Sequence, residues 1–234
     1  MFLEYFNLQD KITVMIEKST LNFLKSLKKN NNREWFEKNR SAYEAAKQNV
    51  LVMAEFLLKE MAKTDPRFAE MKPASCLFRI NRDVRFSNDK SPYKTNFGAA
   101  FSVGGKKGPQ AGFYVHIDPT AAFAGGGIWQ PEPIILQKIR QEIDYQFSDF
   151  KAVISQKKFK AMFGEMSQED ALKKVPKGYD AENPAADFLR NKHFVFSRPF
   201  SESEMTSPSF FKELTSSYHT ILPFLTFLNQ AIEE

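Results

Sequence analysis

The sequence predicts an α+β fold in which an antiparallel sheet is covered on one face by helices. Apolar residues at helical spacing occupy the N-terminal and C-terminal parts of the chain, whereas residues between Ser75 and Trp129 alternate as in strands. Eight of the ten glycines lie in this middle region, and its short connections favour antiparallel pairing. The order of helices, strands and helices therefore predicts one α+β domain over residues 15–234.

The composition excludes several classes of protein. With 42% hydrophobic and 26% charged residues, the chain lies far from the composition of disordered proteins. It lacks the run of about 20 apolar residues that spans a bilayer, which excludes a membrane protein. The single cysteine, Cys76, excludes an internal disulfide and a multi-cysteine zinc site, so we expect a reducing, cytoplasmic location.

Residues 1–14 are predicted to be an N-terminal extension outside the domain. This mixed stretch carries Asp10 and Lys11 in its middle and has none of the parts of a signal peptide. Helix signals begin only after Met15, which suggests Met15 as an alternative start.

The N-terminal half of the domain is predicted to contain two helices. Ser19 or Thr20 can cap a short one, and Asn31 with Glu34 resembles a capping box that begins a long one. The long helix should end before Pro66. Its apolar stripe repeats every seven residues: Phe36, Tyr43, Val50 and Leu57.

Strand patterns fill the middle of the chain. The predicted strands are Ser75–Asn81, Thr95–Val103, Ala111–Asp118 and Ala121–Ile128, with a further one at His193–Phe200. The glycine-rich stretch 104–109 is predicted to be a hairpin loop, and residues 118–120 a tighter turn.

Helix patterns return after Trp129. The predicted segments run from Pro131 or Pro133 to Phe147, over Phe150–Phe163 with Gly164 closing it, over Pro184–Asn191, and from Phe211 to Leu225. Pro223 should kink the last helix or split it in two.

Each predicted strand has one apolar face and one face of small or polar groups. Ala111–Asp118 places Phe113 and Val115 on one side and Tyr114 and His116 on the other. In Ser75–Asn81 the same alternation sets Cys76, Phe78 and Ile80 against Leu77, Arg79 and Asn81. Helices are expected on the apolar face, so the roomier polar face is the best candidate for a site.

Positive charge concentrates next to this face. From Arg79 to Lys107 there are seven basic and two acidic residues, a net +5 that equals the net charge of the whole chain. Such a cluster favours phosphate or carboxylate ligands. The predicted anion-binding residues are Arg79, Arg82, Arg85, Lys90, Lys94, Tyr114, Gly125, Gly126 and Gly127. Tyr93 and Trp129 are predicted to offer stacking surfaces, and His116 is the candidate proton-transfer group.

No motif in the sequence identifies a reaction or a cofactor. The chain lacks a Walker-type phosphate loop, a dinucleotide-binding glycine pattern, a paired-histidine zinc motif and a nucleophile elbow. We therefore predict no cofactor and no metal site, although a hard cation on Asp83, Asp89 and Asp118 is an unsupported alternative. Whether the protein is an enzyme stays open.

Two other functions fit the same basic segment. It could form a nucleic-acid-binding module over residues 79–107, with Phe86, Tyr93 and Trp129 stacking on bases. The modest net charge disfavours this reading. Alternatively, the arginines could pair with Asp83 and Asp89 and only brace a loop in a noncatalytic partner-binding protein. The sequence does not predict the oligomeric state.

Several separated motifs occur in an order that resembles a known family. They are Asn31-Asn32-Arg33-Glu34-Trp35-Phe36, the segment from Arg79 to Thr95, Gly112–Ile117, Ala124–Trp129 and Pro176-Lys177-Gly178-Tyr179-Asp180. Over residues 20 to 200 the chain resembles the bacterial and fungal proteins of domain-of-unknown-function family 2461. The resemblance implies a single cytoplasmic domain, begins near Met15, and carries over no substrate, reaction or catalytic residue.

Overall fold

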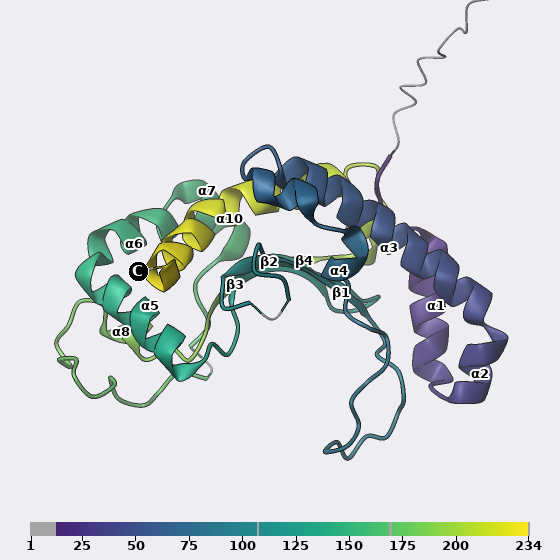
Figure 1. Ribbon diagram of the computed structural model, residues 1–234, viewed down its shortest axis with the longest axis horizontal. Helices are drawn as coiled ribbons and strands as arrows, with labels where there is room; N and C mark the ends of the chain where they lie inside the picture. Colours follow the sequence, from purple (N-terminus) through teal and green to yellow (C-terminus); the bar gives the residue numbers. More distant parts are fainter. Residues whose placement is uncertain (1–12, 107, 169, 234) are drawn as a thin grey trace, which may run out of the picture.

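One antiparallel sheet forms the centre of the protein. In the computed structural model, which describes residues 13–106, 108–168 and 170–233, helices lie over one face of this sheet (Figure 1). The four strands run in the order β1-β2-β3-β4, and every neighbouring pair is antiparallel. Their bounds are β1 Phe97–Phe101, β2 Gly112–Ile117, β3 Ala122–Ile128 and β4 Phe194–Phe200. This architecture confirms the predicted α+β class.

The N-terminal helices differ in detail from the prediction. The helices are α1 Lys18–Lys29, α2 Arg33–Lys38 and α3 Arg40–Met61. Asn32, not Asn31, caps α2, and its side chain accepts a 2.9 Å bond from the Trp35 amide. The prediction of one long helix is wrong, because the chain forms two helices separated at Asn39. The Asn39 side-chain amide donates to the Trp35 carbonyl at 2.8 Å, which favours a break between α2 and α3.

The predicted strand Ser75–Asn81 is wrong. After the 3₁₀ helix η1 (Pro66–Glu70), the helical turn α4 spans Pro73–Cys76, because a proline at the first helical position favours a helix start. In place of a strand, the described chain beyond α4 forms two isolated β-bridges, Leu77 with Ala99 and Asn81 with Tyr93.

The C-terminal half adds further helices. They are α5 Pro133–Tyr145, α6 Phe147–Ile154, α7 Lys157–Phe163, α8 Ala186–Leu189, α9 Glu202–Met205 and α10 Phe210–Glu233. The predicted helix Phe150–Phe163 is divided between α6 and α7, and Gly164 with φ of 68° ends α7. Pro223 lies inside α10 without splitting it.

The two faces of the sheet have different environments. Helices α3 and α10 cover one face, while α5, α6 and α8 lie beside the sheet and the loop before β1 projects from the opposite face (Figure 1). On the covered face, Phe113 of β2 is buried and meets Tyr218 of α10 edge-on, with ring centroids 5.7 Å apart. Prediction and structure agree on this division between a helix face and an open face.

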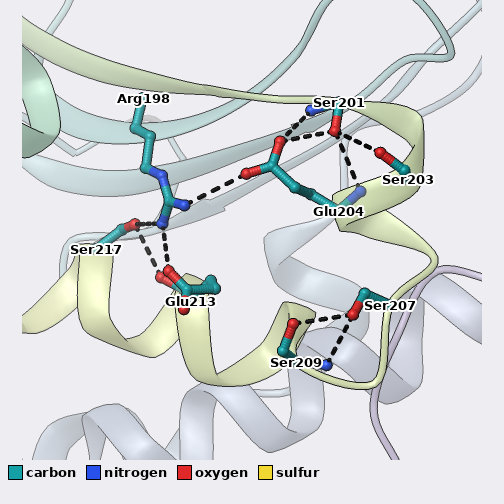
Figure 2. A network of polar contacts seen from close by, with 8 residues as sticks. All are labelled: Arg198, Ser201, Ser203, Glu204, Ser207, Ser209, Glu213 and Ser217. Carbon is teal, nitrogen blue, oxygen red and sulfur yellow. Dashed lines mark hydrogen bonds and ion pairs between the residues drawn. The ribbon is translucent and has the colours of Figure 1, made fainter.

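One cation lies on the helix face of β4. The Arg198 guanidinium donates to Glu213 at 3.0 Å and reaches Glu204 and Ser217 at 3.5 Å (Figure 2). Ser201 and Glu204 form a capping box that begins α9 and holds the Glu204 carboxylate in place. The network therefore ties β4 to α9 and α10.

The chain before α1 joins the core. Val14 is buried, and the Ile16 amide donates to the Met205 carbonyl at 2.9 Å. The predicted extension over residues 1–14 lies outside the described residues except for Thr13 and Val14. None of the helices in the described ranges has the length and apolar character needed to cross a bilayer.

Strand β4 is an edge of the sheet. Its residues pair with β3 on one side, and no other described strand pairs with its outer side. Pro199, opposite Phe123 in the register, lies near the end of β4.

Candidate functional site

A cavity of about 1010 Å³ lies on the open face of the sheet. Its floor consists of short residues from all four strands: Gly98, Ala100, Gly112, Gly125, Gly127 and Ser197. Its walls include four aromatic side chains, those of Phe78, Tyr114, Phe123 and Trp129. A wide, largely apolar hollow with a few polar groups is typical of a small-molecule site.

Two glycines keep the floor flat because strands β3 and β4 approach closely. A Cβ on Gly125 would lie 2.0 Å from the Phe196 carbonyl oxygen, and one on Gly127 would lie 1.9 Å from that of Phe194. Gly127 also has φ of 133°, which favours glycine. Strand β3 lies between β2 and β4, so it forms the middle of the floor. Because Gly125 and Gly127 have no side chains, the space above this part of the sheet stays open.

Tyr114 and His116 stand side by side on β2. The Tyr114 hydroxyl lies 3.2 Å from His116 Nδ1, and the His116 ring stacks on Phe123 with centroids 4.9 Å apart. Burial lowers the pKa of His116, although the Asp118 charge opposes the shift, and burial raises the pKa of Tyr114. Both residues are partly buried on the open face, and Tyr114 lines the cavity whereas His116 does not.

Two lysines meet at one aromatic ring on the rim. Lys94 Nζ and Lys106 Nζ each lie 5.4 Å from the centroid of Phe78. Lys106 also donates to the Leu77 carbonyl. Burial lowers the pKa of Lys94, and the positive charges of Arg79 and Lys106 lower it further.

Neither lysine forms an ion pair with a carboxylate in the described part of the chain. Some lysines elsewhere form such pairs, for example Lys38 with Glu34 at 2.8 Å and Lys59 with Glu55 at 2.7 Å. The cavity rim thus holds two ammonium groups that no carboxylate of the described residues pairs with.

The segment 81–92, which we call the arm, leaves the sheet through a closed neck. The Arg82 amide donates to the Pro92 carbonyl at 2.9 Å. Next to the neck, Tyr93 is buried and stacks on Phe36 with centroids 4.0 Å apart. The Asn31 side chain bonds both the amide and the carbonyl of Tyr93, at 3.1 and 2.9 Å. Tyr93 is therefore held away from the cavity.

Most cations of the arm have partners within the arm. The Arg82 guanidinium bonds Asp89 and, at 3.2 Å, the Ser91 carbonyl. Arg85 grips Asp83 through two bonds of 3.0 and 2.7 Å. Hydrogen bonds from Ser91, followed by that from Arg82, lower the pKa of Asp89 to about 2. These pairs stabilise the shape of the arm.

The cavity brings together only part of the predicted site. Among its lining residues are Arg82, Lys94, Tyr114, Gly125, Gly126, Gly127 and Trp129. Arg79, Arg85, Lys90, Tyr93 and His116 do not line it. Lys90 instead donates to the Val84 carbonyl at 3.1 Å. Trp129 is 59% exposed at the mouth, beside His193 with ring centroids 4.1 Å apart.

Comparison with known proteins defines the family of the chain. The sequence model of the family described as conserved hypothetical protein (DUF2461) matches residues 19–227. The chain belongs to this family. No curated protein and no solved structure matches it. Two motifs of this DUF2461 chain take part in the cavity: the segment Arg79–Thr95 supplies the arm and Lys94, and Ala124–Trp129 supplies the floor and the mouth.

Sequence reasoning missed several lining residues of this DUF2461 cavity. They include Phe78, Asn96, Lys106 and Gln110. Lys106 lies within the basic segment 79–107, so its charge could have identified it as an anion-binding candidate from the sequence. Phe78 was assigned to the apolar face of a strand that does not form, and the turn at α4 instead directs its ring toward Tyr114, 6.1 Å away.

The aspartates of this region are occupied by protein groups. Asp118 Oδ1 accepts bonds from the Thr120 amide at 2.7 Å and the Ala121 amide at 3.0 Å, which forms the predicted tight turn. The described residues contain no group of three or more side chains suited to hold a metal ion.

Proposed function

We propose that the open-face cavity binds a small molecule that carries a phosphate or carboxylate group on an apolar body. The observation that carries this proposal is the pair Lys94 and Lys106, two ammonium groups at one aromatic ring without a carboxylate partner. Lys94 is partly buried and Lys106 is exposed beside it. A partly buried cation without a carboxylate partner costs free energy, and an anionic ligand would reduce that cost.

The side chains of the cavity walls indicate that the rest of the ligand is apolar. Phe78, Phe123 and Trp129 supply apolar surface, and the glycines of β3 leave room for a flat group above the sheet. Burying such a group stabilises the complex by roughly 25 cal/mol per Å² of apolar surface, before the cost of association. The cavity therefore favours an amphipathic anion over a bare inorganic one.

In this proposal Tyr114 contacts the ligand and His116 is a positioning residue. The phenol borders the cavity, and the imidazole of His116, next to it on β2, lies 3.2 Å from its hydroxyl. A ligand above the floor would find the Tyr114 hydroxyl as a hydrogen-bonding group.

The other two readings of the basic segment receive less support. Nucleic-acid stacking would use Tyr93, which is buried against Phe36. Internal bracing accounts for Arg82 and Arg85 but not for the cavity or for the two lysines on its rim.

Binding of 8-anilinonaphthalene-1-sulfonate, an aromatic anion, tests the proposal. In a Trp35→Phe background, Trp129 is the remaining tryptophan, so energy transfer to the probe reports binding at the mouth. We expect saturable binding, weakened about tenfold or more by Lys94→Met/Lys106→Met because two favourable charges are lost.

A matched double variant serves as control. Lys59 and Lys151 also lie over phenylalanine rings, at 5.1 and 5.8 Å, but away from the cavity. Lys59→Met/Lys151→Met makes the same change in charge and should leave probe affinity unchanged. The neutral analogue N-phenyl-1-naphthylamine should bind wild type and both variants alike. Equal loss of sulfonate affinity in both double variants, or no energy transfer from Trp129, would contradict the proposal.

A further inference from the structure

The chemistry of the free cations indicates which anion the cavity takes. A guanidinium fork suits a carboxylate because it binds both oxygens at once. The fork of Arg82, the arginine that lines the cavity, is already engaged by Asp89, Ser87 and the Ser91 carbonyl. The uncompensated cations on the rim are ammonium groups, which act as compact point charges and are common ligands of phosphate.

The number of charges points the same way. Lys94 and Lys106 share one ring, and Arg79 lies close enough for its charge to act on Lys94. The acidic residue in the lining, Asp83, is gripped by Arg85. A singly charged ligand would leave one of the two ammonium groups uncompensated, whereas a dianion balances both.

We propose that the ligand is a phosphomonoester in its dianionic form, with the phosphate at Lys94 and Lys106 and a flat apolar group over Gly125 and Gly127. This inference rests on the proposed function and narrows it to one class of anion. Asn96, which also lines the cavity near Lys94, would supply a neutral hydrogen-bonding group to the phosphate.

Calorimetric titration with phenyl phosphate and benzenesulfonate tests this inference, because the two probes share a ring and differ in charge. The second pKa of a phosphomonoester lies near 6, so the dianionic fraction rises about tenfold from about pH 5 to about pH 7. We expect phenyl phosphate to bind about tenfold more tightly at the higher pH and more tightly there than benzenesulfonate. The affinity for benzenesulfonate should not rise.

The groups of the protein that face the two ammonium groups do not produce this increase. They are Cys76, Arg79, Arg82 and Asp83 from the segment before β1, and Tyr114 from β2, whose hydroxyl contacts His116. Burial raises the pKa of the Cys76 thiol, which therefore stays neutral over this pH range. Protonation of His116 at low pH would add positive charge and strengthen anion binding there, which is the opposite direction. The Arg85 contacts lower the pKa of Asp83, so its carboxylate stays ionised.

The outcomes separate the two proposals. Equal affinities for both probes with no rise for phenyl phosphate would overturn the phosphate inference and leave the anion cavity standing. Absence of binding by either probe would overturn both. In Lys94→Met/Lys106→Met the preference for phenyl phosphate should disappear, and in Lys59→Met/Lys151→Met it should persist. If the first variant does not fold, the pH comparison on the wild-type protein still decides.

Discussion

Cations lie on both faces of the same sheet, and their surroundings differ. On the helix face, Arg198 has two glutamates and a serine around its guanidinium (Figure 2). On the open face, Lys94 and Lys106 have an aromatic ring and one backbone carbonyl. A cation whose partners come from the chain stabilises the fold, and a cation whose partners are missing is suited to bind a ligand.

The same contrast divides the basic segment itself. Arg82 and Arg85 bond Asp89 and Asp83 within the arm, although they belong to the same run of charge as Lys94. Proximity in sequence therefore does not give these residues a common role. The pairing of each side chain decides it.

The largest expected effect compares neighbouring residues on the two faces. Phe113→Ala removes a buried ring that packs on Tyr218, and should lower the free energy of unfolding by about 3–5 kcal/mol. Tyr114→Ala empties part of a cavity that already contains space, so its loss should be less than half as large. Urea unfolding of both variants measures the difference. Equal losses would mean that the open face is packed as tightly as the helix face.

A smaller effect is expected for the cations. Arg198→Met separates β4 from two glutamates at a partly buried position, and should lower the free energy of unfolding by about 1–3 kcal/mol. Lys94→Met should change it by less than about 0.5 kcal/mol, or raise it, because the repulsion from Lys106 and Arg79 is removed. A loss for Lys94→Met as large as that for Arg198→Met would show that Lys94 is a structural residue.

The smallest effect concerns pH. Burial keeps the pKa of His116 in the folded protein below its ordinary value, so the unfolded chain takes up a proton first as the pH falls. The stability due to the neutral imidazole is therefore present above the ordinary pKa of about 6.5 and is lost as the pH falls through the folded value. We expect the free energy of unfolding, measured with urea, to fall less between neutral and mildly acidic pH for His116→Gln than for the wild type. If the free energy of unfolding fell equally in the two proteins, groups other than His116 would cause its pH dependence.

The spacing of apolar residues predicted correctly those helices and strands in which one spacing, helical or alternating, holds over the whole element. Strand β2 was predicted because Phe113, Val115 and Ile117 alternate with smaller or polar residues, and the structure buries those three. The segment around Phe78 shows the same alternation, but the turn at Pro73 begins a short helix and only isolated bridges follow. Alternation over a few residues does not distinguish a strand from an irregular segment with buried anchors.

The candidate site was predicted in part for a related reason. The sequence places a basic segment near an open sheet face, and Lys94 and Tyr114 line the cavity there. It does not show that Asn31, distant in the sequence, bonds the backbone of Tyr93 and removes that ring from the cavity. Nor does it show that the β1–β2 connection brings Lys106 to the ring of Phe78. Both depend on contacts between distant parts of the chain.

Pro199 gives the outer side of β4 a further property. An unpaired strand edge can recruit a strand from another molecule and so begin fibrous aggregation. Proline has no amide hydrogen, so an incoming strand meets a missing donor beside Arg198 and Ser197. The protein can thus keep one sheet face uncovered while the proline limits growth of the sheet from the β4 edge into an intermolecular assembly.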